Sequence, residues 1–114
     1  MIKKLFTVLE GAGIEVYMPA KKTGKCASPY AVIKEEKTEL NATGKSVSIF
    51  FSVSVVVPLD SYGMLDEADR KVKSALKGSA FKFQGSSDEE SDGEIGGYIR
   101  KLIYTAKKRA VCTT

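Results

Sequence analysis

The chain contains no histidine and no tryptophan, and only two of its 114 residues are cysteine. Without histidine it lacks the commonest general base and the commonest metal ligand of proteins. A zinc site built on Cys26 and Cys112 alone would need unusual carboxylate partners, so we expect no metal site. We expect both cysteines to be free thiols, because nothing near either one in the sequence indicates reactivity.

Long apolar runs are also absent. No stretch approaches the ~20 residues of a membrane span, and the opening M-I-K-K-L-F lacks a signal-peptide core. We therefore expect a protein that is made and used in a cytoplasm, without a membrane partner, where a disulfide is disfavoured. A length of 114 residues with 43% hydrophobic and 28% charged residues is typical of one globular domain, residues 1–114.

The clearest pattern present is a period of two between Ser46 and Pro58, S-V-S-I-F-F-S-V-S-V-V-V-P. Odd positions are large and apolar, whereas even positions are serine except at Phe50 and Val56. Such alternation predicts a β-strand with one buried face and one small, uncharged face. That second face, which includes Ser48 and Ser52, is either wet or packed against another surface.

The remaining patterns predict an α+β domain with a mostly antiparallel sheet and two helices on one face, in the order α-β-β-β-α-β-β. Apolar residues at helical spacing predict a helix from residue 2 that Gly11 caps, and a second one that Asp60 or Ser61 begins and Gly78 ends. The expected strands cover residues 14–18, 30–39, 46–58, 79–83 and 98–107, with a hairpin turn at 41–45.

Two polar loops of opposite charge are expected between these elements, at residues 19–29 and 84–97. The first is basic through Lys21, Lys22 and Lys25. The second contains the acidic tract 88–94, whose carboxylates are Asp88, Glu89, Glu90, Asp92 and Glu94. The tract lacks the ligand spacing of a calcium loop, so we expect no cation there. Either the loops are simply solvated, or their charges suit head-to-tail pairing of neighbouring subunits.

No catalytic constellation or cofactor motif emerges from the sequence. The segment K-K-T-G-K at 21–25 lacks the glycine spacing of a phosphate-binding loop. The aromatic residues do not form the pattern of an RNA-binding sheet, which favours core or interface packing for them. The chain is therefore expected not to be an enzyme and to need no cofactor, which leaves a binding or assembly module.

Four segments resemble the tail-terminator (tail-completion) proteins of tailed bacteriophages and prophages: I-K-K-L-F-T-V-L, S-P-Y-A-V-I-K-E-E, S-V-S-I-F-F-S-V-S-V-V-V, and S-Y-G-M-L-D-E-A-D-R-K-V-K-S-A-L. The final Y-I-R-K-L-I-Y strand is also similar. The resemblance covers nearly the whole chain as a pattern of elements, and the acidic tract 88–94 departs from it.

The resemblance implies a structural virion protein that is assembled in the bacterial host cytoplasm and located in the phage tail. Such a protein forms a homo-oligomeric ring, usually a hexamer, on the head-proximal end of the tail tube. It ends tube polymerisation and presents a surface to the head–neck connector. Its partners would be further copies of itself, the tail tube protein and the connector, with nucleic acid only passing through the ring lumen.

Two alternatives remain open: another neck or minor head–tail joining protein, and a small nucleic-acid-binding module that uses the basic strand at 100–109. On the ring interpretation, Ser48, Phe50 and Ser52 suit a subunit contact because they cost little to desolvate. A wet surface facing the ring lumen is the competing interpretation of the same residues.

Overall fold

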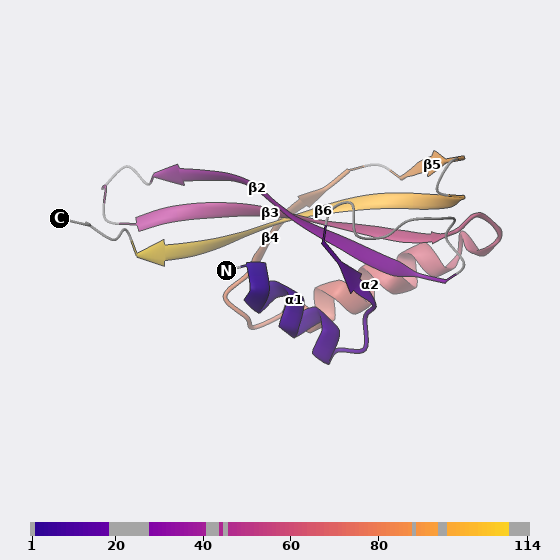
Figure 1. Cartoon of the computed structure of the whole chain (residues 1–114), viewed down its shortest axis with the longest axis horizontal. Helices are drawn as coiled ribbons and strands as arrows, with labels where there is room; N and C mark the ends of the chain where they lie inside the picture. The colour runs from indigo at the N-terminus through magenta and orange to yellow at the C-terminus, as the bar shows by residue number, and fades with distance from the viewer. Residues whose placement is uncertain are drawn as a thin grey trace.

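A six-stranded sheet carries both helices on one of its faces, as Figure 1 shows for the computed structural model. The structure describes residues 2–18, 28–40, 44, 46–87, 89–93 and 96–109. The helices are α1 (Ile2–Gly11) and α2 (Met64–Leu76), preceded by a short 3-10 turn at Leu59–Ser61. The strands are β1 (Val16–Tyr17), β2 (Tyr30–Leu40), β3 (Ser46–Pro58), β4 (Lys82–Ser86), β5 (Glu90–Asp92) and β6 (Gly97–Arg109).

Strand β3 lies at the centre of the sheet, whose order is β1-β2-β3-β6-β4. It pairs antiparallel with β2 on one side and with β6 on the other, while β1 joins β2 in parallel. The far edge of β6 carries two short strands in succession, β4 opposite residues 102–105 and β5 opposite residues 97–99. The expected α+β class, with both helices on one face, is confirmed.

One core lies between the helices and the sheet. The odd residues of β3 point into it, as their alternation predicts, and Phe51, Val53 and Val57 are wholly buried there. Buried apolar residues of the two helices cover them: Leu5 and Leu9 of α1, and Leu65, Val72 and Leu76 of α2. In each helix these residues recur at the spacing that keeps them on one side.

The strands β2, β3 and β6 extend past the helices, at the left of Figure 1, and give the molecule extents of 52 × 26 × 24 Å. On this projecting end, residues 34–40 of β2 are all exposed, including the apolar Leu40 at 66%. The predicted hairpin connects β2 to β3; within it Gly44 has a φ of +69°, and the other residues of 41–45 lie outside the described part of the chain.

Several boundaries differ from expectation. Gly11 is the last helical residue of α1, and the positive φ of +83° falls instead on Gly13. Helix α2 begins at Met64, so neither Asp60 nor Ser61 caps it. The strand expected at 79–83 is β4, shifted three residues towards the C-terminus. Gly78 follows α2 at a φ of +79°, as predicted.

The prediction of a loop over residues 84–97 is wrong, because residues 84–86 belong to β4 and residues 90–92 to β5, and both strands pair with β6. Between these two strands, the Ser87 amide donates to the Lys101 carbonyl at 2.9 Å, and the Lys101 amide donates to Ser87 Oγ at 3.1 Å. Glycine, serine and acidic residues have low strand propensity, but the open edge of a 13-residue strand supplies the pairing that propensity alone does not predict.

Candidate interaction surfaces

The serine face of β3 is covered by charged side chains from its two neighbours. Glu36 of β2 and Lys101 of β6 form an ion pair across β3, with Oε1 and Nζ 3.1 Å apart. A hydrogen bond from Ser52 and the nearby Lys101 hold the pKa of Glu36 below its ordinary value. Ser52 is only 3% exposed as a result. The face is therefore uncharged only along β3 itself.

Glu36 lies at a bulge of β2, two residues after Lys34, which is opposite Ser52. Glu35 lies opposite Phe51 and Lys37 opposite Phe50, so Glu36 is the additional residue between them. A bulge of this kind redirects a side chain. Beyond it, Lys37 Nζ lies 4.6 Å from the centre of the Phe50 ring. Phe50 and Ser48 are half-buried within the single chain.

The acidic tract lies partly on an edge of the sheet. Glu89 accepts a hydrogen bond from the Tyr62 hydroxyl and pairs with Arg100, whose Nη2 lies 3.2 Å from Glu89 Oε2. The hydrogen bond from Tyr62, and after it the pair with Arg100, lower the pKa of Glu89. The same hydrogen bond raises the pKa of Tyr62. Glu90 is exposed, and Asp92 pairs through its backbone with Gly97. Asp88, Glu94, Lys21, Lys22 and Lys25 lie outside the described residues.

Arg100 links this edge to helix α2. Its Nη1 lies 2.8 Å from Asp69 Oδ2 and 3.0 Å from Asp66 Oδ1. The hydrogen bond to Asp69 is the main reason that the pKa of Arg100 is raised. Lys101, the next residue, faces the opposite side of the sheet and pairs with Glu36. The basic strand at 100–109 thus begins with two cations already neutralised within the chain, which weakens the case for phosphate binding there.

A groove that sequence reasoning missed lies between α2 and β4. It is open, about 440 Å³ in volume, and lined by Arg70, Lys73, Ser74, Lys77, Phe83 and Tyr104. We call it the α2–β4 groove. Arg70, Lys73 and Lys77 are three and four residues apart, and this spacing puts them on one side of the helix. The same spacing is the feature of the sequence that could have indicated the groove. Lys73 Nζ lies 4.7 Å from the centre of the Phe83 ring, and Phe83 remains 44% exposed at the edge of the sheet.

Tyr104 forms the floor of this groove. The Tyr104 and Phe83 rings meet edge to face with centroids 5.5 Å apart. Burial raises the pKa of Tyr104 to about 12, and the nearby Asp69 carboxylate adds to the effect. Within the described part of the chain, the Tyr104 hydroxyl has no hydrogen-bond partner.

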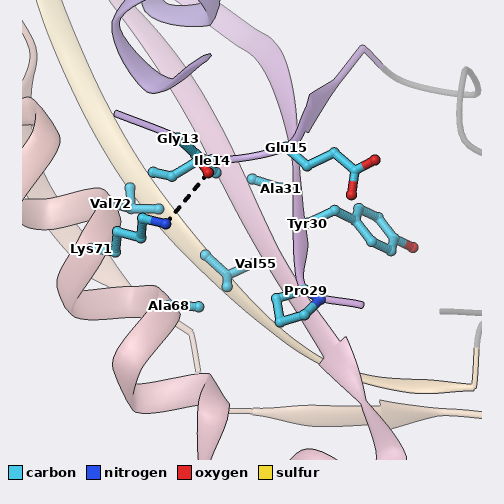
Figure 2. A pocket seen from close by; sticks show the side chains of 10 residues that line it. All are labelled: Gly13, Ile14, Glu15, Pro29, Tyr30, Ala31, Val55, Ala68, Lys71 and Val72. Carbon is cyan, nitrogen blue, oxygen red and sulfur yellow. Dashed lines mark hydrogen bonds between the residues drawn. The ribbon is translucent and has the colours of Figure 1, made fainter. Parts of the chain in front are cut away.

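A smaller pocket of about 70 Å³ lies where α2 meets the start of β2 (Figure 2). Its wall includes Pro29, Val55 and Ala68, and Lys71 Nζ donates to the Gly13 carbonyl at 3.4 Å. Cofactor pockets usually enclose roughly 300–1,000 Å³, so this one is too small for such a ligand. Among the described residues, no group of three or more His, Cys, Asp or Glu could hold a metal ion, and no helix is long and apolar enough to cross a membrane.

Comparison with known proteins shows a likeness to a solved structure. No family model matches the sequence, and no curated protein matches it. Among solved structures, a chain from a structure described as "Virion of native gene transfer agent (GTA) particle" superposes with a TM-score of 0.69. The alignment covers 96% of this chain and 92% of that chain at 16% sequence identity. The likeness establishes that the two chains share a fold over nearly their whole length.

Proposed function

We propose that the protein is a structural component of a phage-like virion, and specifically a tail terminator. In this role it forms a ring, with six subunits as the expected number, on the head-proximal end of the tail tube. The ring ends tube polymerisation and offers a surface to the head–neck connector. The observation that carries the proposal is the shared fold, over nearly the whole chain, with a chain of a gene transfer agent virion.

The geometry supports an assembly role rather than a chemical one. Three long strands form a sheet that continues past the helices (Figure 1), and its projecting end presents the exposed residues 34–40 of β2, including Leu40, for contact. Cations gather in the α2–β4 groove, whereas Glu89 and Glu90 lie near the β5–β6 turn. Two different patches on one chain are what a head-to-tail ring requires. The proposed role includes no catalytic step.

A second candidate has the same support. The structural neighbour is described only as part of a virion, so a head–tail joining or neck protein is equally compatible with the shared fold. The two roles differ in what happens to the tail tube: a terminator limits tube length, whereas a joining protein acts after the length is fixed.

The deciding experiment is electron microscopy of tails assembled with and without this protein. A terminator predicts tubes of uncontrolled length in its absence and tubes of defined length, each with a ring at one end, when purified protein is added. Tails of normal length that fail to join heads would support the joining role. Normal, infectious particles without the protein would contradict both roles.

A further inference from the structure

The α2–β4 groove contains positive charge that no described residue neutralises. Arg70 and Lys77 are exposed, and neither forms an ion pair with any residue in the described ranges. Lys73 is shared between Asp69 Oδ1, at 3.2 Å, and the ring of Phe83. By contrast, Arg100 and Lys101 each have carboxylate partners. The groove therefore combines a row of cations with an exposed aromatic ring, and this combination suits an acidic partner.

The sequence contains one segment of matching charge, the acidic tract at 88–94, which has five carboxylates in seven residues. Within it, β5 (Glu90–Asp92) is an edge strand that pairs only on its β6 side among the described elements. Glu90 is exposed and has no ion pair with any of the described residues. The exposed carboxylate of Glu90 on this edge thus complements the unneutralised cations of the groove.

We propose that the α2–β4 groove of one copy binds the acidic β5 edge of a second copy. Within one chain the two parts lie apart along β6. Phe83 lies opposite Tyr104 and Glu90 opposite Ile99. Those positions on β6 are five residues apart, which corresponds to about 17 Å at a strand rise of ~3.3 Å per residue.

The proposed contact joins two different patches, so it is heterologous, and repetition of it generates either a ring or an open filament. It rests on the proposed ring-forming function and names the surfaces that would close the ring. The rings of Phe83 and Tyr104 form an apolar wall on one side of the groove. An apolar wall lowers the local dielectric constant, which strengthens the attraction between Lys73 and an incoming carboxylate. Arg70 and Lys77 supply the more exposed charges.

Charge exchange tests the contact directly. One variant carries Arg70→Glu and Lys77→Glu, a second carries Glu90→Lys and Asp92→Lys, and a third combines all four changes. We expect each two-residue variant to reduce the self-association constant at least about tenfold, equivalent to ~1.4 kcal/mol, and the combined variant to recover most of the loss. Native mass spectrometry and sedimentation, in solution and on tail tubes, measure assembly. The matched control for the first variant is Lys3→Glu with Lys4→Glu, which makes the same charge change on exposed residues of α1.

Several outcomes would overturn the proposal. Among them are unchanged assembly of both two-residue variants, failure of the combined variant to recover, and a wild type that stays monomeric both in solution and on tubes. Loss of tube binding or of oligonucleotide binding with intact self-association would assign the groove to a different acidic partner. The proposed function is tested separately by tube length: charge-sensitive rings that leave tube length uncontrolled would refute the terminator role and retain the contact.

Discussion

Glu36 of β2 and Lys101 of β6 are joined by an ion pair of 3.1 Å that passes over the strand between them, and Ser52 lies beneath it. Three strands thereby contribute to one polar cover on the face without helices. The small side chains of β3 leave room for the long side chains of its neighbours. Part of the serine face is therefore already packed within one chain.

Replacement of Ser52 by lysine should destabilise the single chain. The new ammonium group would have to displace Lys101 or Glu36 from a site that is 3% exposed. We expect a loss of about 2–3 kcal/mol in the free energy of unfolding, measured by urea denaturation. Unchanged stability would show that the cover above Ser52 opens freely.

Ser48→Lys is the better test of whether this face meets another subunit. Ser48 is half-buried and lies nearer the projecting end, so we expect a stability change within about 0.5 kcal/mol. If the face is a subunit contact, the folded variant should fail to assemble; if it faces a wet lumen, assembly should survive. Native mass spectrometry of the folded variant distinguishes the two results.

Acid should weaken the fold partly through Glu36. Its pKa in the folded protein is lowered from the ordinary value of 4.5, first by the hydrogen bond from Ser52 and then by Lys101. A lowered folded pKa stabilises the protein above the unfolded value, and this contribution is lost as the pH falls through the folded value. In Glu36→Gln, the unfolding free energy should therefore depend less on pH below 4.5, as measured by urea titrations at several pH values. If the unfolding free energy of this variant varies with pH as steeply as that of the wild type, the contribution of Glu36 to acid sensitivity would be contradicted.

Removal of Arg100 should be far more damaging than removal of an exposed cation. The side chain of Asp69 is 11% exposed, and Arg100→Met would leave this carboxylate with only the more exposed Lys73 nearby. Breaking a buried pair in this way typically costs about 3–5 kcal/mol. Combining Arg100→Met with Asp69→Asn should recover part of the loss, as a double-mutant cycle would measure; the exposed Lys77→Met serves as the control.

Tyr104→Phe should retain or slightly increase stability at neutral pH. The substitution removes a buried hydroxyl that has no hydrogen-bond partner among the described residues and keeps the ring contact with Phe83. Burial raises the pKa of Tyr104 from 10.0 to about 12. Since the unfolded chain ionises first, this tyrosine makes the wild type lose stability as the pH rises from 10.0 towards about 12. The variant should lose less over that range, as measured by alkaline denaturation; an identical alkaline loss would contradict this account.

The sequence alone predicted those features that depend on local periodicity. Alternation over Ser46–Pro58 specified the central strand and its buried face, because side chains of a strand point to opposite sides at every step. Helical spacing of Leu5 with Leu9 and of Leu65 with Val72 and Leu76 located both helices. The α+β class and the position of the helices on one face followed from the order of these elements.

Only the tertiary structure decided which surfaces remain free for contact. The register of β2, β3 and β6 depends on how the three strands align, so no pattern within β2 could show that Glu36 would meet Lys101 over Ser52. Pairing to the open edge of β6 turned much of an expected loop into β4 and β5, against local propensity. In the same way, Arg100 and Lys77 are equivalent cations in the sequence. Packing against α2 neutralises Arg100 with two aspartates, whereas Lys77 stays exposed beside an open groove.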